Sequence, residues 1–190
     1  LMAWVAGKFG LDVLLPLGKI IIGFYFGCLL HAVFTLGGTL AFFARLNPMR
    51  FFKGIISAQA VAFTTTSSSG TLPVTMECVQ ENLGVSKPIS SFVLPLGATI
   101  NMDGTALYQG VAVLFIAQAY SIDLTTANYI TIILTSTLAS IGSAGVPGAG
   151  LIMLTLVLTS VGLPLEGIAL VAGIDRILDM ARTAINVTGD

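Results

Sequence analysis

The polar side chains with the most evident chemistry lie near the end of the sequence. Five of them have the spacing of one helical face: Asp175, Asp179, Arg182, Asn186 and Asp190. Arg182 offers a planar fork of donors that suits a carboxylate, and Asp179 suits an ammonium group. This combination favours a zwitterionic substrate with a second carboxylate. The alternative is that Asp179 and Arg182 simply pair with each other, which would let a polar helix enter a membrane.

A second polar group interrupts the apolar stretch 88–122, in which Asp103 is the one charge. On an unbroken helix Asn101 and Thr105 would share a face and Asp103 would point almost the opposite way. We therefore expect the helix to unwind near Gly104, where glycine makes unwinding cheap. Freed carbonyls would then join the hard oxygen ligands that suit a small cation such as Na⁺, namely those of Asn101, Asp103, Asn186 and Asp190.

The composition is that of a membrane protein. Of the 190 residues, 55% are hydrophobic and only 9% are charged, and the mean hydropathy is +0.97. Soluble domains carry about 25% charged residues, so a water-soluble fold is strongly disfavoured. A net charge of −1 without a basic patch disfavours nucleic-acid binding. The two cysteines, Cys28 and Cys78, are too few for a disulfide framework and are predicted to be apolar filler.

Residues 20–44 carry no Asp, Glu, Lys or Arg and would reach about 37 Å as a helix, enough to cross a membrane. His31 lies in the middle of this stretch. An ionisable side chain at that depth is a functional candidate. The favoured interpretation is nevertheless a neutral imidazole hydrogen-bonded to a neighbouring helix.

Two further apolar stretches are interrupted by segments that cannot face lipid. In the first, a run of six hydroxyl residues ends at Gly70, and we expect Ser67 to Gly70 to form the tip of a re-entrant hairpin. In the second, residues 142–150 contain glycines and a proline that cannot continue a helix. Each limb is too short to cross a membrane comfortably, which predicts two re-entrant hairpins.

The order of these segments predicts an all-α membrane protein of the inverted-repeat type, with transmembrane helices interleaved with two re-entrant helical hairpins. The chain begins with Leu1 and has no signal-peptide layout, so we expect a C-terminal-half fragment of a larger protein. The predicted segments are the end of a scaffold helix at 1–15 and a transport domain at 16–190. The latter comprises a transmembrane helix at 16–45, hairpins at 49–86 and 126–163, a broken helix at 88–121 and a polar helix at 165–190.

Four motifs together resemble the glutamate transporter family, the dicarboxylate/amino acid:cation symporters. They are SSSGTLP at 67–73, NMDGT at 101–105, the glycine-rich stretch 142–150 and DMARTAINVTGD at 179–190. They occur in the family's order and spacing over nearly the whole chain, and they look most like those of a prokaryotic member. The resemblance implies a multi-pass protein of the cell membrane, whose transport domain slides like an elevator against a homotrimeric scaffold.

The resemblance also implies roles for individual residues. Ser68 and Asn186 would hold the substrate α-carboxylate, Asp179 the amino group, and Arg182 with Thr105 the side-chain carboxylate. The rest of the substrate pocket would be Ser69, Met102, Val146, Gly150 and Thr183. The first Na⁺ site would be Gly97, Asn101, Asn186 and Asp190. The second would be Thr99, Ser140, Ile141 and Ser143, largely through their carbonyls. Asn101 and Asp103 would share a third site with a helix outside this sequence.

Because Asp179 and Arg182 are both present, the resemblance implies import of L-glutamate or L-aspartate, with no organic cofactor and no enzymatic activity. The intact Asn101, Asp103, Asn186 and Asp190 favour Na⁺ as the coupling ion. Coupling to H⁺ stays open because a buried carboxylate can titrate, as does transport of a C4-dicarboxylate. The chain departs from the family in two places. Thr66 stands where some prokaryotic relatives have arginine, and Met180 where animal relatives have one. Arg176 is at neither position, and its favoured interpretation is an ion pair with Asp175.

Functions of other classes fit the sequence less well. Asp103 and Asp190 could form an intramembrane aspartyl protease dyad, and Gly189-Asp190 resembles part of such a motif. However, Val187 stands where the first glycine of that motif belongs, and Arg182 has no part in that chemistry. A serine hydrolase would need His31 beside Ser68. A passive channel is a further alternative, and it would conduct ions without saturable uptake of a substrate.

Overall fold

The computed structural model describes residues 14–190, and its first element is a long apolar helix. Three segments follow each other without a break: α2 (Leu14–Leu30), the π-helical η2 (His31–Leu36) and α3 (Gly37–Phe42). The stretch Leu15–Phe42 is long and apolar enough to cross a membrane, as is Lys87–Ala119. The helix ends three residues before the predicted limit at residue 45. The predicted segment 1–15 lies almost wholly outside the described residues.

A helical hairpin follows, which we call hairpin 1. Its elements are α4 (Pro48–Gly54), α5 (Ile56–Thr65), α6 (Ser68–Glu77) and the π-helical η3 (Cys78–Asn82). The chain reverses at Thr66, which has a left-handed backbone with φ 55°, and at Ser67, whose hydroxyl accepts a hydrogen bond from Gly70 N at 3.0 Å. The reversal is therefore narrower than the predicted tip, because Ser68 to Gly70 already form the first turn of α6.

The predicted broken helix consists of α7 (Lys87–Ile100) and α8 (Asp103–Ala119). The two residues between them, Asn101 and Met102, have non-helical backbones. At the start of α8 the carboxylate of Asp103 accepts a hydrogen bond from Gly104 N at 3.0 Å. Unwinding is thus confined to two residues and separates Asn101 from the helix that carries Asp103.

The second hairpin, hairpin 2, consists of α9 (Thr126–Ile141), α10 (Ala149–Ser160) and the loop between them. Thr125 and Asn128 form a capping box that fixes the start of α9. The loop turns at Gly148, whose φ of 77° is one that residues with a side chain rarely adopt. Large apolar side chains of α9, among them Ile133 and Leu138, are exposed on the outer face, as expected where lipid or another apolar partner covers a helix.

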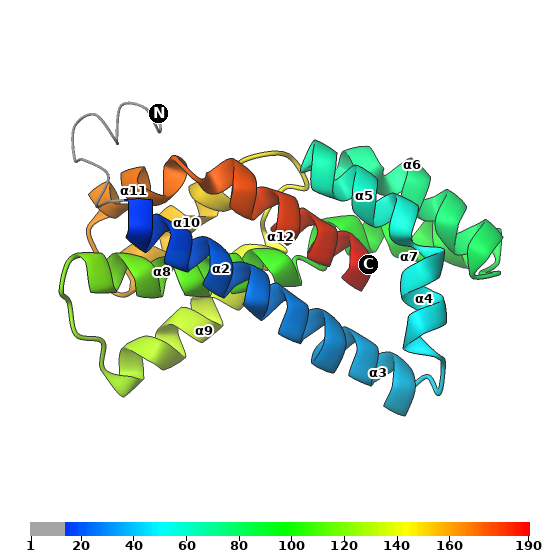
Figure 1. The fold of residues 1–190 in the computed structure, drawn as a ribbon, viewed down its shortest axis with the longest axis horizontal. Helices are drawn as coiled ribbons and strands as arrows, with labels where there is room; N and C mark the ends of the chain where they lie inside the picture. Colours follow the sequence, from blue (N-terminus) through cyan, green and yellow to red (C-terminus); the bar gives the residue numbers. More distant parts are fainter. Residues whose placement is uncertain (1–13) are drawn as a thin grey trace.

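The polar helix predicted at 165–190 is divided into η4 (Leu165–Gly167), α11 (Ile168–Ala172) and α12 (Asp175–Gly189). The division falls at Gly173 and Ile174, so α12 begins with the charged residues. Figure 1 shows α12 running lengthwise through the middle of the molecule, between hairpin 1 and the pair α2 and α8. Most of its 15 residues are buried, polar ones included.

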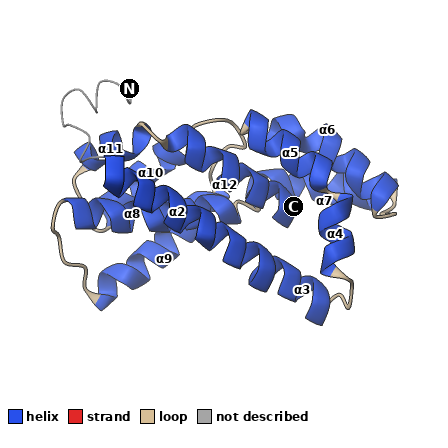
Figure 2. Ribbon diagram, viewed as in Figure 1, coloured by secondary structure: helices blue, strands red, loops and turns tan. Residues whose placement is uncertain are grey.

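The described part of the chain is helical, and loops alone join the helices (Figure 2). The larger apolar core lies where α8 packs against α2, α9, α10 and α12, around the fully buried Phe24, Val113 and Leu154. A smaller core between hairpin 1 and α12 is built from Ala58, Ala62 and other small side chains. Cys28 and Cys78 lie buried in these two cores as free thiols, in agreement with the sequence interpretation.

Close packing of α8 on α12 depends on Gly104. A Cβ atom at this position would overlap the backbone carbonyl of Arg182 and come within 2.9 Å of Asn186 Oδ1. Gly110, two turns later on α8, has no heavy atom within 4 Å of the place where its Cβ would lie. Gly104 therefore leaves no room for a side chain, whereas Gly110 in the same helix does.

We expect Gly104→Ala to lower the free energy of unfolding by about 1–3 kcal/mol, because a backbone atom of α12 must move. The matched control Gly110→Ala should raise it by about 0.5–1 kcal/mol, since alanine favours a helix interior. Denaturation of the purified full-length protein in detergent measures both. Equal effects of the two substitutions would contradict the close packing of α8 on α12.

Candidate substrate and cation site

A small polar cavity lies where α12 meets the tip of hairpin 1, the loop of hairpin 2 and the break between α7 and α8. Its volume is about 10 Å³, room for about one water molecule. Its lining residues are Thr66, Ser68, Met102, Thr105, Ser143, Ala144, Gly145, Val146, Asp179, Arg182, Thr183 and Asn186. Eight of the ten predicted substrate residues are among them, so the structure brings most of this set together.

Asp179 is the centre of the polar contacts and is 2% exposed. One carboxylate oxygen accepts hydrogen bonds from Arg182, with Nη2 at 2.7 Å and Nε at 3.2 Å, and from Thr183 Oγ1 at 3.0 Å. The other accepts a hydrogen bond from Gly148 N at 3.0 Å. Asp179 thus neutralises Arg182 and also connects α12 to the loop of hairpin 2. The pairing that the sequence left as an alternative is present.

Arg182 retains donor capacity that residues 14–190 do not use. Its guanidinium lies 4.9 Å from the centre of the Tyr108 ring, a cation–π contact, and rests against Gly150. Atom Nη1 is buried and has no hydrogen-bond partner among the described residues. A buried charged donor without a partner is costly, so a carboxylate brought to this place would be stabilised.

Asn186 connects α12 to the start of α8. Its Oδ1 accepts a hydrogen bond from Thr105 N at 3.3 Å. Its Nδ2 donates to Thr105 Oγ1 at 3.1 Å and lies 3.2 Å from the sulfur of Met102. All three residues are buried. The break before α8 therefore brings the hydroxyl of Thr105 and the thioether of Met102 to the amide of Asn186, in the cavity that Asp179 and Arg182 also line.

The two hairpins meet directly over this cavity. The carbonyl of Gly145 in hairpin 2 accepts hydrogen bonds from Ser67 Oγ at 2.9 Å and from Ser69 N at 3.2 Å. Ser69 itself does not line the cavity. Because these contacts close the site over a space of about 10 Å³, a ligand the size of an amino acid requires one hairpin to move.

Residues of the first predicted Na⁺ site also lie together. A Cβ atom on Gly97 would come within 3.3 Å of Asp190 Oδ1, and Asn101 Nδ2 lies 3.5 Å from the carbonyl of Asn186. Asp190 Oδ1 is buried without a hydrogen-bond partner in the described structure. A carboxylate oxygen in this position is the hard ligand that a small cation prefers.

Asp103 is hydrogen-bonded to His31, with Nε2 of the imidazole 2.6 Å from Oδ2. This contact confirms that His31 is hydrogen-bonded to a neighbouring helix. The π-helical segment η2 begins at His31, and such segments often mark functional positions. Both residues line a cavity of about 630 Å³ that α8 shares with hairpin 2. Asp103 and Asn101 both lie against Gly189.

The four residues of the second predicted Na⁺ site, expected to bind largely through carbonyls, make no side-chain hydrogen bonds to one another in the described structure, although Ser143 N donates to the carbonyl of Ser140 at 3.0 Å. The hydroxyl of Thr99 is bonded within its own helix to the carbonyls of Pro95 and Leu96, both at 2.9 Å. The Ile141 side chain is 46% exposed, whereas Ser140 and Ser143 are buried. These four residues stay a prediction.

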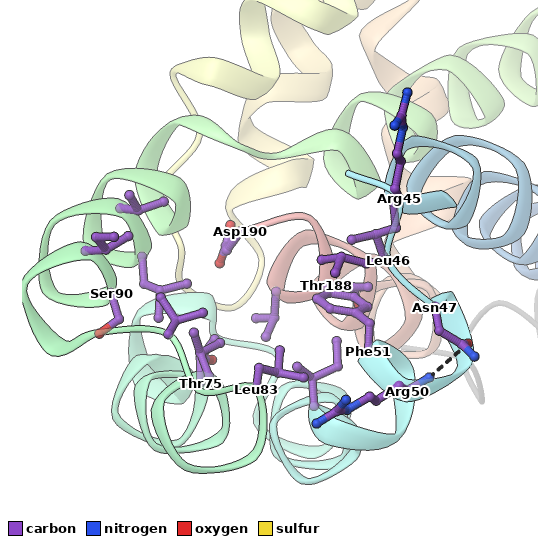
Figure 3. A pocket seen from close by; sticks show the side chains of 18 residues that line it. Arg45, Leu46, Asn47, Arg50, Phe51, Thr75, Leu83, Ser90, Thr188 and Asp190 are labelled. Atoms are coloured by element: carbon purple, nitrogen blue, oxygen red, sulfur yellow. Dashed lines mark hydrogen bonds between the residues drawn. The ribbon is translucent and has the colours of Figure 1, made fainter. Parts of the chain in front are cut away.

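An apolar cavity of about 530 Å³, much larger than the small polar cavity, lies beside the last turn of α12. Thr188 and Asp190 line it together with the apolar side chains of Leu46, Phe51 and Leu83, and Figure 3 shows Thr188 beside Leu46 and Phe51. Of the predicted site residues it contains Asp190 alone. Its lining is mostly apolar, whereas the small polar cavity is lined by charged and hydroxyl side chains.

Sequence reasoning missed three features of the site and misjudged one residue. It gave no role in the site to Tyr108 below Arg182, to Gly145 between the hairpins or to Thr66 in the lining, because none of them carries a charge that marks it. The predicted ion pair between Arg176 and Asp175 was wrong. The guanidinium of Arg176 donates instead to Thr66 Oγ1 and to the carbonyl of Thr64 at the tip of hairpin 1.

The fold and the site define a helical membrane protein with a closed, charged cavity between two hairpins. A sequence profile of the sodium:dicarboxylate symporter family matches residues 1–190. The chain belongs to this family, which consists of transporters and not of enzymes.

Animal transporters are among its relatives. It is 48% identical to excitatory amino acid transporter 2 of Homo sapiens over 174 residues, covering 92% of this chain and 30% of that protein. It is 52% identical to excitatory amino acid transporter 1 of Rattus norvegicus over 164 residues, covering 86% and 30%. For an excitatory amino acid transporter of Caenorhabditis elegans the identity is 50% over 166 residues, covering 86% and 33%. The chain thus spans about a third of these relatives, which do not support the expected prokaryotic origin.

The contact between Asp179 and Arg182 can be tested through protein stability. Asp179→Asn and Arg182→Met should each lower the free energy of unfolding by about 3–5 kcal/mol, because each leaves a buried partner unpaired. The double variant should lose less than the sum, with a coupling of about 1–3 kcal/mol. Denaturant unfolding of the purified full-length protein without substrate measures the cycle, and additive losses would contradict the pairing.

Proposed function

We propose that the full-length protein is a secondary symporter that imports acidic amino acids together with Na⁺. The observation that carries this proposal is the buried guanidinium of Arg182. It is neutralised by Asp179, it lines the closed cavity, and its buried Nη1 has no hydrogen-bond partner among the described residues. A carboxylate is the ligand such a donor selects. The names of the relatives, which are excitatory amino acid transporters, agree with this chemistry.

In the proposed complex a zwitterionic substrate lies between Asp179 and Arg182. Its side-chain carboxylate pairs with Arg182 and with the hydroxyl of Thr105, and its amino group pairs with Asp179. Ser68 and Asn186 hold the α-carboxylate. The substrate therefore takes over contacts that Asp179 and Arg182 make with each other. The remaining pocket residues are Ser69, Met102, Val146, Gly150 and Thr183.

Entry requires hairpin 2 to open. Its loop is bonded to the rest of the site through three hydrogen bonds, one from Gly148 N to Asp179 and two from hairpin 1 to the carbonyl of Gly145. Hairpin 1, in contrast, is packed on α12 through the small residues Ala58 and Ala62. Hydrogen bonds without an apolar cluster hold the loop of hairpin 2, whereas an apolar cluster holds hairpin 1 on α12, and this difference supports hairpin 2 as the gate.

We place the coupling Na⁺ ions on oxygen ligands beside the substrate. Gly97, Asn101, Asn186 and Asp190 form the first site, supported by the unpartnered Oδ1 of Asp190. The remaining ligands belong to the other predicted sites and are Thr99, Asp103, Ser140, Ile141 and Ser143. Coupling to H⁺ is the second candidate, because His31 and Asp103 form an acid–base pair within the membrane segment. Transport of a C4-dicarboxylate is less well supported because Asp179 would then lack a cationic partner in the substrate.

The wider setting follows from the family. We propose that the hairpins are re-entrant, that the domain moves by an elevator mechanism, and that the full-length protein is a homotrimer in the cell membrane. The exposed apolar faces of α2 and α9 support contact with lipid or with a scaffold.

Substitution of Arg182 tests the proposed substrate. We expect Arg182→Ala to reduce L-aspartate uptake by at least about a hundredfold, since a pair of charge-assisted hydrogen bonds is lost. Proteoliposomes with the full-length protein and an inward Na⁺ gradient measure this, after gel filtration has established that the variant is folded. The control Arg50→Gln removes an exposed charge outside the site and should transport normally. Normal aspartate uptake by a folded Arg182→Ala variant would refute the proposal.

Gly150 provides a second test that leaves every charge in place. A Cβ at this position would overlap the guanidinium of Arg182, so Gly150→Ala should displace Arg182 and raise the KM for L-aspartate at least about tenfold. The control is Gly142→Ala in the same hairpin, where a Cβ would meet its nearest neighbour at an ordinary 3.5 Å. Equal KM values for the two variants would show that Gly150 does not support Arg182.

A further inference from the structure

Arg176 makes a contact between distant parts of the chain that the proposed binding site does not use. It lies in the first turn of α12 and is itself exposed. Its guanidinium donates from Nη1 to Thr66 Oγ1 and from Nη2 to the carbonyl of Thr64, the latter at 3.3 Å. Both acceptors belong to the tip of hairpin 1, 110 or more residues earlier in the sequence.

The acceptors explain why an arginine suits this place. The carbonyl of Thr64 is one of the last carbonyls of α5, which have no partner within the helix. A cation at the end of a helix also interacts favourably with the helix dipole. Thr66 is 1% exposed and has the left-handed backbone that turns the chain into α6. Arg176 therefore stabilises the residue at which hairpin 1 reverses.

The same tip is held from its other side by hairpin 2. Ser67 Oγ and Ser69 N both donate to the carbonyl of Gly145. If hairpin 2 opens, these bonds break together, whereas the bonds from Arg176 come from α12 and are unaffected. Ser68, which lies between these two donors, is buried in the polar cavity.

We infer that Arg176 is a positioning residue that anchors the tip of hairpin 1 to α12 while hairpin 2 is open. The anchor keeps Ser68 in place to receive the substrate carboxylate before the gate closes. This inference rests on the proposed function, in which hairpin 2 is the gate. It assigns to Arg176 a role that acts through Thr66 and not through contact with the substrate.

Four variants of the full-length protein test this role: Arg176→Gln, Arg176→Lys, Thr66→Val and the double variant Arg176→Gln/Thr66→Val. Thr66→Val keeps the side-chain shape and removes the hydroxyl. We expect Arg176→Gln to raise the KM for L-aspartate about fivefold, the effect of an exposed hydrogen bond, with kcat retained. Thr66→Val should raise the KM less, because Arg176 keeps its bond to the carbonyl of Thr64. The double variant should have the KM of Arg176→Gln, since both substitutions remove the bond between Arg176 and Thr66 Oγ1. Arg176→Lys should have a KM between those of the wild type and Arg176→Gln, because lysine keeps the positive charge but lacks the planar guanidinium with its two donors.

Hydrogen exchange of the tip supplies a readout that does not need transport. In substrate-free protein, the amide hydrogens of residues 66–70 should exchange faster in the Arg176→Gln variant than in the wild type. In the Arg50→Gln variant they should exchange at the wild-type rate. Unchanged KM and unchanged exchange in Arg176→Gln would overturn the inference, as would additive effects of Arg176→Gln and Thr66→Val. Absence of uptake by the wild-type protein would refute the proposed function instead, and hydrogen exchange would still decide whether Arg176 anchors the tip.

Discussion

Charged side chains lose the stabilisation of water when they are buried, and the polar face of α12 imposes this cost at the centre of the molecule. Asp179 and Arg182 are 2% and 3% exposed. They persist there because Asp179 neutralises Arg182 and because Thr183 and Gly148 N supply further donors. The neighbouring elements are arranged to bring such partners to one helix.

The interruptions in the other helices follow from the same requirement. A regular helix uses its backbone polar groups internally, so a site lined by backbone donors and acceptors requires helices that end inside the protein. Hairpin 1, hairpin 2 and the break at Asn101 and Met102 each place such ends against α12. The closure between the hairpins depends on one carbonyl, that of Gly145. A site closed by so few bonds can open at modest cost while the core around α8 stays packed.

Much of the site could be predicted from the sequence, because residue spacing fixes which side chains share a helical face. The spacing of Asp179, Arg182 and Asn186 predicted their common orientation, and the glycine-rich stretch predicted a loop. Partners across helices could not be predicted in this way. The bond between His31 and Asp103 was expected only as some bond to a neighbouring helix, and Arg176 was assigned to Asp175. Both depend on how hairpins and helices pack, which local spacing does not determine.

The most direct test of the account is uptake of labelled L-aspartate into proteoliposomes that contain the full-length wild-type protein. Inward Na⁺ and inward H⁺ gradients are imposed separately, with succinate and a neutral amino acid as competing substrates. The account predicts saturable uptake that is driven by the Na⁺ gradient alone and is not inhibited by the neutral amino acid. Uptake driven by H⁺ alone would contradict the assignment of Na⁺ to the oxygen ligands around Asp190. Absence of aspartate uptake under either gradient would contradict the proposed function itself.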